Sequence, residues 1–82
     1  MRIDLALKHV CLAKSRSIAK SLCDDGRVLI NGKPAQASST IRTGDRIRIR
    51  FAERTVEIEI LDVPLKQASK PDAPRYYRIL SE

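Results

Sequence analysis

Apolar residues in the first part of the chain recur with the period of an α-helix, in which successive residues are turned by about 100°. This pattern predicts helices over residues 3–11 and 16–24, joined by a turn at residues 12–14. Ser15 is a suitable N-cap for the second helix, and Gly26 is expected to end it in the left-handed conformation. The expected apolar positions are Ile3, Ala6, Leu7 and Val10 in the first helix and Ile18, Ala19, Leu22 and Cys23 in the second.

Beyond residue 26 the pattern changes to the alternation that is typical of half-buried β-strands. Asn31-Gly32 favours a two-residue hairpin turn, and three prolines within residues 64–75 indicate a solvated loop. Strands are therefore predicted at residues 27–30, 34–36, 46–51, 56–60 and 76–80.

These elements predict an α+β fold, in which a two-helix, helix-turn-helix-like element packs on a small, mostly antiparallel sheet. A chain of 82 residues has the length of a single domain. We expect residues 1–63 to form its main part and residues 64–75 to form a loop. Residues 76–82 are expected to form a C-terminal strand and tail that pack on the same domain.

Charge is distributed unevenly along the chain. Lysine and arginine total 16 against 10 acidic residues, which gives a net charge of +6. Residues 1–50 hold 11 basic and 4 acidic residues, whereas residues 51–82 hold 5 basic and 6 acidic residues. The excess positive charge therefore belongs to the first part of the chain, and it suits an anionic partner.

The sequence gives little support to metal binding, membrane insertion or catalysis. Cys11, Cys23 and His9 are too few for a four-ligand zinc site, and we expect two free thiols in a reducing cytosol rather than a disulfide. No apolar run approaches the ~20 residues of a bilayer-spanning helix, and no secretory signal is visible. Each glycine has a turn role, so no glycine-rich phosphate loop is present. We expect a cytoplasmic, non-enzymatic protein without a cofactor.

The arginines of the predicted strands have local acidic partners. Arg46, Arg48 and Arg50 lie opposite the strand that carries Glu57 and Glu59, and cross-strand pairs of opposite charge are common in antiparallel sheets. We therefore expect their charge to be largely matched, so that they add little to the field of the molecule.

The cations of the predicted helices are matched less completely. Asp4 is expected to pair with Lys8 at i,i+4, and Asp24 is the other acidic residue on the polar faces. Arg16 begins a helix, where the backbone N–H groups and the helix dipole favour an anion such as phosphate and disfavour a cation. Because Arg2 and Arg16 lie off the apolar stripes, we expect them to contribute to RNA binding and little to stability.

The aromatic residues favour one mode of nucleic-acid recognition. Phe51, Tyr76 and Tyr77 are the only aromatic residues, and none lies among the helical cations. Contacts with phosphates and with the shape of folded RNA are therefore expected, rather than base stacking. His9 is expected on a polar face, where it could add a contact. The candidate RNA-binding residues are Arg2, Lys8, His9, Lys14, Ser15, Arg16, Lys20, Arg27 and Lys33.

The segments RIDLALKHV, SRSIAKSLCDDGRVLING and IRTGDRIRIRF resemble the S4-like RNA-binding domain. The resemblance implies a two-helix element, the αL motif of that family, packed on a small sheet and binding structured RNA. The matching positions are Arg16 after the turn, Ala19 in the helix, Gly26 at its end, Asn31-Gly32 in the hairpin, and Gly44-Asp45 before a strand.

Over nearly its whole length the chain is similar to the RqcP family and to the small heat-shock S4-like proteins. This resemblance implies a factor of bacterial ribosome-associated quality control. The implied partners are the stalled large ribosomal subunit, its rRNA and the retained peptidyl-tRNA, with an RqcH-type factor that adds an alanine tail to the nascent chain. We expect a monomer. Arg2 and Arg16 match RNA-contacting arginines of that family, and Asp4 and Lys14 also fit its pattern, whereas Leu5, Cys11 and Ser15 stand where it often has basic residues.

Other functions are compatible with the same residues. The chain could bind another structured RNA, such as tRNA or a small regulatory RNA, or it could act as a heat-shock ribosome-recycling factor. A protein-interaction module would use the outer face of the sheet, and its binding would survive high salt. An RNA-modifying enzyme is disfavoured, because S4-like domains acquire that activity from a fused catalytic domain and none is expected here.

Overall fold

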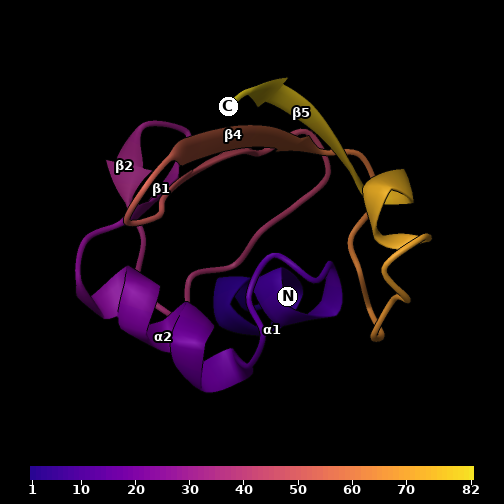
Figure 1. The fold of residues 1–82 in the computed structure, drawn as a ribbon, viewed down its shortest axis with the longest axis horizontal. Helices are drawn as coiled ribbons and strands as arrows, with labels where there is room; N and C mark the ends of the chain where they lie inside the picture. The colour runs from indigo at the N-terminus through magenta and orange to yellow at the C-terminus, as the bar shows by residue number, and fades with distance from the viewer.

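One antiparallel sheet forms a layer over two short helices in the computed structural model, which describes all 82 residues (Figure 1). The strand order is β2-β1-β3-β4-β5, and both helices lie on the same face of the sheet. The predicted fold class is therefore confirmed. The elements are α1 (Ile3–His9), α2 (Arg16–Asp24), β1 (Val28–Ile30), β2 (Lys33–Pro34), β3 (Arg46–Arg50), β4 (Thr55–Ile60), a 3₁₀ turn η1 (Ala73–Arg75) and β5 (Tyr77–Ser81).

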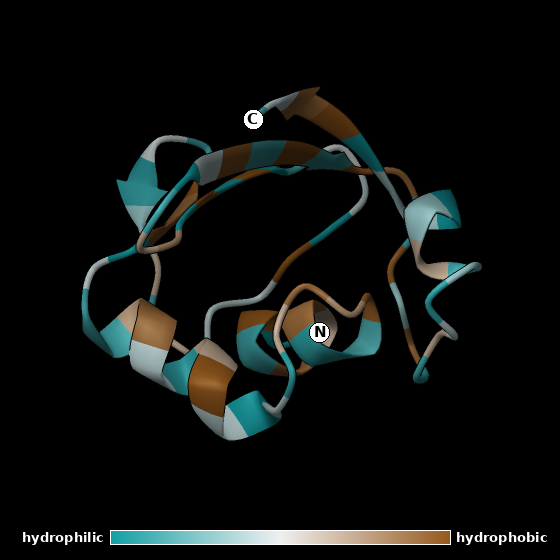
Figure 2. Ribbon diagram, in the orientation of Figure 1, coloured by the Kyte–Doolittle hydropathy of each residue, from teal (hydrophilic) through white to brown (hydrophobic).

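The core lies between the sheet and the helices, because every second residue of the central strands points toward the helices. Ile47 pairs with Ile58 across β3 and β4, and Ile49 pairs with Val56. These side chains join Ile3, Leu7, Ala19 and other apolar residues of α1 and α2 in one buried cluster. Figure 2 shows the corresponding alternation of hydrophobic and hydrophilic residues along β4. The strict alternation in the sequence thus fixes which face of the sheet is buried.

The predicted hairpin between β1 and β2 is confirmed. Asn31 and Gly32 have φ values of 52° and 83°, and positive φ at both central residues is the requirement of a type I′ turn. The Asn31 side chain donates to Asp45 Oδ1 (3.1 Å) and accepts from the backbone N–H of Arg46 (3.0 Å). The return strand comprises only Lys33–Pro34 and not residues 34–36, although the N–H of Ala35 still donates to Val28 O at 2.9 Å.

Both helices end in the same way, with a left-handed residue after the C-cap. At the end of α2, Gly26 has φ +74°, and the N–H groups of Gly26 and Arg27 donate to Cys23 O and Leu22 O. This is the Schellman arrangement, and it confirms the predicted helix end. At the end of α1 the equivalent residue is Cys11, with φ +62°. Helix α1 therefore ends at His9 rather than at residue 11. This end was not predicted, because a non-glycine residue in the left-handed conformation gives no sequence signal.

The apolar side of α2 is narrower than predicted. Ala19 and Cys23 are buried and Leu22 is half-buried, but Ile18 is 45% exposed. Ser15 caps the helix as predicted, because its Oγ accepts from the N–H of Ile18 at 3.1 Å. Neither helix, at seven and nine residues, has the length and apolar character needed to cross a membrane.

Residues 64–75 form a loop that ends in η1, but three of its residues, Pro64, Ala68 and Ala73, are buried rather than solvated. The loop folds against the end of α1, where Ala68 and Ala73 form a second small apolar cluster with Val10 (Figure 1). The His9 ring lies beneath this segment and is buried, and its Nδ1–H donates to Pro64 O at 2.7 Å. The prediction that His9 lies on a polar face is therefore wrong. Short-range patterns cannot reveal a contact between residues 55 positions apart.

Replacing Gly26 by valine should lower the free energy of unfolding by about 1–2 kcal/mol, the cost of holding an L-residue in the left-handed region. An added Cβ meets no atom within 4 Å, so the loss comes from backbone conformation and not from crowding. Urea denaturation measures it. Gly26→Asn is the control and should lose less, because asparagine tolerates this conformation. Equal losses in the two variants would contradict this account.

Candidate nucleic-acid interface

A buried carboxylate joins the two arginines that the sequence singled out. Asp4 lies in the first turn of α1 with a side chain only 2% exposed, and its Oδ2 lies 3.2 Å from both Arg2 Nη2 and Arg16 Nε. Its Oδ1 accepts from the backbone N–H of Leu5 at 2.7 Å. The predicted Asp4–Lys8 pair is therefore wrong. We call Arg2, Asp4 and Arg16 the arginine cluster.

The backbone fixes all three members of the arginine cluster. Arg2 is extended and forms an isolated β-bridge with Thr40. Around it, Ile3 N–H donates to Ser39 O and Ile41 N–H donates to Met1 O, both at 2.8 Å. Arg16 is the first residue of α2, next to its Ser15 cap. The cluster thus stands where the N-terminal strand-like segment meets the start of the second helix.

Two opposing effects act on the pKa of Asp4. Burial is the larger single effect and by itself would raise the pKa. The hydrogen bond from Arg16, the N–H of Leu5 and the charges of both arginines together outweigh burial, so the pKa lies below its ordinary value of 3.8. Asp4 is therefore ionised at neutral pH, and the arginine cluster carries a net charge of +1.

The guanidinium groups of the arginine cluster are held in position, and most of their hydrogen-bond donors stay free. The Arg2 and Arg16 side chains remain 49% and 48% exposed. A guanidinium has five N–H donors, and each of these groups makes one hydrogen bond to Asp4. Most donors therefore remain available to a ligand. Two oriented guanidiniums suit the bidentate recognition of phosphate.

The lysines differ from the arginines in their surroundings. All six ion pairs of the molecule use an arginine, and none uses any of the six lysines. Lys14 and Lys20 are exposed and Lys8 is half-buried. The first turn of α2 also carries no acidic residue. The charge of the helical lysines is therefore not neutralised within the protein.

One depression gathers lysines from separate parts of the chain. It lies between the end of α1, the turn before α2 and residues 64–75, and we call it the lysine depression. Lys70 was not predicted as a site residue, because no sequence pattern near it indicates that residues 64–75 pack against α1. The depression has a volume of about 640 Å³ and is lined by Lys8, Cys11, Leu12, Ala13, Lys14, Gln67 and Lys70.

Not every predicted site residue belongs to this helical surface. His9 is buried, as described above. Arg27 directly precedes β1, and its guanidinium donates to Arg50 O at 3.1 Å in a second depression that also contains Asp25 and Glu53. Lys33 is exposed in the short edge strand β2. Ser15 caps α2 with its side chain.

The ion pairs on the outer face of the sheet differ in part from those that were predicted. Arg48 pairs with Glu57 at 3.3 Å, as expected. Glu59 lies opposite Arg46 but pairs with Arg78 of β5, and Arg50 lies opposite Thr55, so neither Arg46 nor Arg50 has an acidic partner. The prediction failed for Glu59 because it did not place the strand predicted at residues 76–80 beside β4.

Comparison with known proteins gives one family model and several similar full-length sequences. The S4 domain model matches residues 1–47, which include the arginine cluster and the hairpin. The RQC P-site tRNA stabilizing factor of Bacillus subtilis is 38% identical over 82 residues, which is 100% of this chain and 94% of that protein.

Two solved structures are similar in fold. The trimeric Heat Shock Protein 15 of Vibrio cholerae has a TM-score of 0.93 and 27% identity, covering 99% of this chain and 82% of that one. The solution structure of the hypothetical protein HP1423 has a TM-score of 0.84 and 35% identity, covering 100% and 99%. Both similarities include residues 64–82, which lie beyond the family model.

Replacing Arg16 by alanine should lower the free energy of unfolding by about 1–3 kcal/mol, because Asp4 stays buried after losing one of its partners. The expectation from the sequence that Arg16 contributes little to stability did not include this pairing with Asp4. Lys20→Ala, one turn further along α2, is the control and should change stability by about 0.5 kcal/mol or less. The effect of Arg16→Ala should shrink in an Asp4→Asn background. Equal losses in the two alanine variants would show that the pairing does not matter.

The arginine cluster should also make stability depend on pH. Because the pKa of folded Asp4 is lowered, its contribution is complete above the ordinary value of 3.8 and is lost as the pH falls through the lower folded value. Denaturation of wild type and Asp4→Asn from about pH 7 to about pH 2.5 measures this effect. The free energy of unfolding of wild type should exceed that of Asp4→Asn by a constant amount at neutral pH, and this difference should decline below pH 3.8. An advantage that persists unchanged to the lowest pH would count against the ionised cluster.

Proposed function

We propose the function of this chain from its family, because it belongs to the S4 domain family and within it to the RQC P-site tRNA stabilizing factors. In this proposal it binds large-subunit rRNA and tRNA and stabilises peptidyl-tRNA on stalled large ribosomal subunits. It acts in the bacterial cytoplasm as a binding factor and not as an enzyme. An RqcH-type partner on the same subunit adds the C-terminal alanine tail to the nascent chain.

The observation that carries this proposal is the arginine cluster beside lysines that have no acidic partner. Arg2 and Arg16 are oriented by Asp4, and Lys14 and Lys20 extend the positive charge along the turn and α2. Phosphate contacts of this kind determine where a protein lies on a nucleic acid and how tightly it binds. They do not depend on base identity, which suits a surface composed of folded rRNA and tRNA.

Two charged regions suit an RNA ligand less well. In the depression beside Arg27, Arg54 stacks over Phe51 at 5.5 Å, and Asp25 and Glu53 would repel a phosphate. On the outer sheet face, Arg46 and Arg50 are unpaired, but Arg48 and Arg78 are held by Glu57 and Glu59, whose carboxylates would also repel a phosphate. We therefore assign the RNA to the helical surface, with Arg2, Lys8, Lys14, Arg16 and Lys20 as its contacts.

A second candidate function is that of a heat-shock S4-like factor that acts in ribosome recycling. The close structural similarity to Heat Shock Protein 15 favours it. The higher sequence identity to the tRNA stabilizing factor, over almost the whole of both chains, favours the first proposal. The two proposals differ in whether the captured large subunit retains tRNA.

Affinity capture from cells at moderate salt, followed by sequencing of the bound RNA, tests the proposal. The informative variant is Lys14→Gln/Lys20→Gln, because these side chains have no structural partner, whereas removing Arg2 and Arg16 would leave Asp4 buried and unpaired. Wild type should capture large-subunit rRNA and tRNA without small-subunit rRNA. The variant should lose both.

The matched control is Arg48→Gln/Arg78→Gln, which removes the same charge from the outer face of the sheet and should retain both RNAs. Capture of large-subunit rRNA without tRNA would favour the second candidate. Capture of an unrelated RNA would keep RNA binding and overturn the ribosomal role. Equal loss in both double variants would mean that net charge, and not this surface, determines binding.

A further inference from the structure

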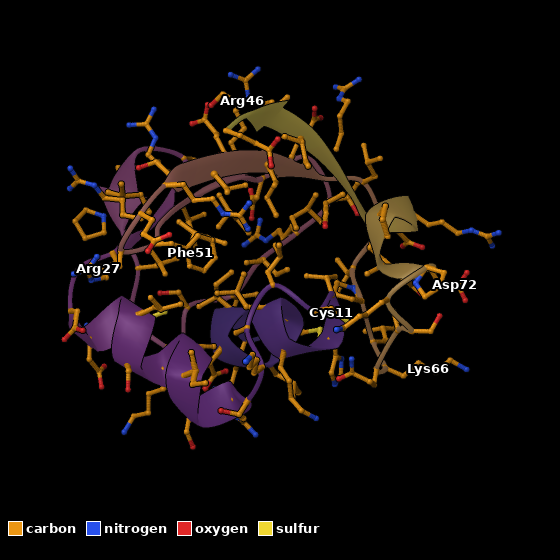
Figure 3. All side chains as sticks on the ribbon, in the orientation of Figure 1. Cys11, Arg27, Arg46, Phe51, Lys66 and Asp72 are labelled. Carbon is orange, nitrogen blue, oxygen red and sulfur yellow. The ribbon has the colours of Figure 1, made fainter.

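Residues 64–75 are held against the end of α1 by several hydrogen bonds that involve two residues, His9 and Cys11. The His9 ring donates to Pro64 O at 2.7 Å, and His9 O accepts from Ala68 N–H at 3.0 Å. The Cys11 thiol donates to Ala68 O at 3.4 Å, and Gln67 Nε2 donates to the same oxygen at 3.0 Å. Figure 3 shows the Cys11 sulfur on the side of the helices that faces this segment. The segment therefore has a defined position beside α1.

This position brings Lys70 into the lysine depression together with Lys8 and Lys14. No carboxylate lines the depression, and none of the three ammonium groups is in an ion pair. Asp72, two residues from Lys70, pairs instead with Arg75 at 3.7 Å. Three like charges around one depression repel one another and favour a bound anion.

We propose that the lysine depression binds a backbone phosphate of the RNA and that Lys70 is one of its contacts. This inference rests on the proposed function and extends the RNA-binding surface beyond residues 1–47, which the S4 domain model matches. Gln67 is a positioning residue, because its amide is bonded to the backbone of its own segment and of His9. Lysine suits this role, since an ammonium on a flexible stem contacts a phosphate without a fixed geometry.

The size and composition of the depression agree with a phosphodiester ligand. A volume of about 640 Å³ is ample for a phosphate with its adjoining sugar. The lining contains no aromatic residue on which a base could stack. The ligand class is therefore the RNA backbone and not a nucleobase or a nucleotide cofactor.

The test compares Lys70→Gln with Lys66→Gln in the full chain. Both changes remove one exposed lysine from residues 64–75, but Lys66 does not line the depression and is labelled near the tip of the loop in Figure 3. Each variant is titrated against purified large ribosomal subunits that carry P-site peptidyl-tRNA, at several salt concentrations. Lys14→Gln, within the depression and on the proposed helical surface, is measured in parallel.

Lys70→Gln should weaken binding at low salt and reduce the slope of log K against log salt by about 0.7–0.9, the value of one phosphate contact. The ratio of wild-type affinity to Lys70→Gln affinity should therefore fall about threefold as salt rises from about 50 mM to about 200 mM. Lys66→Gln should keep the wild-type slope. A purely structural role for Lys70 would lower affinity without this change in slope, and would overturn the inference.

The outcomes also separate this inference from the proposed function. Weaker binding by Lys14→Gln with an unchanged Lys70→Gln would keep the proposed function and overturn the lysine depression as a site. Equal changes in slope for Lys66→Gln and Lys70→Gln would also overturn it, because they would indicate a diffuse charge effect. No binding by wild type would overturn both.

Discussion

The buried carboxylate of Asp4 has to be matched by positive charge, because an ion removed from water and left unpaired costs on the order of several kcal/mol. Arg2 and Arg16 supply that charge, and in doing so they are held at fixed positions on the surface. The folding requirement of one acidic residue thus determines the geometry of two basic ones. The pairing also joins the residue before α1 to the first residue of α2, so the relation between the helices and the shape of the binding surface have the same cause.

Arginine and lysine have separate roles in this molecule. Six of the ten arginines form the ion pairs of the molecule, whereas all six lysines remain unpaired. A planar guanidinium can satisfy a carboxylate and still present further donors, which an ammonium group cannot do with the same geometry. Charge held in place by the fold therefore lies beside charge that is free to move. An RNA surface of irregular shape can use both, since the fixed groups define its position and the flexible ones adapt to it.

Signals within a few residues were sufficient to predict most of the elements. The alternation of residues 46–60, Asn31-Gly32, Ser15 and Gly26 each specify a strand, turn or helix end by local chemistry, and the structure agrees with them. The end of α1 was missed because Cys11 adopts the left-handed conformation without a glycine, but the failures at the site have a different cause, which is contact between distant residues. Asp4 meets Arg16 across 12 positions and His9 meets Pro64 across 55. The site was therefore predicted as a set of cations, but not as a cluster organised by Asp4, and Lys70 was missed entirely.

The hydrogen bonds of the first residues have a consequence for the order in which the chain folds. Met1 and Ile3 are bonded to Ile41 and Ser39, and the end of α1 is covered by residues 64–75. Because a chain is synthesised from its N-terminus, α1 is made before all of these partners. The position of α1 therefore depends on residues that are synthesised after it, and the proposed RNA-binding surface is complete only once residues 64–75 are available.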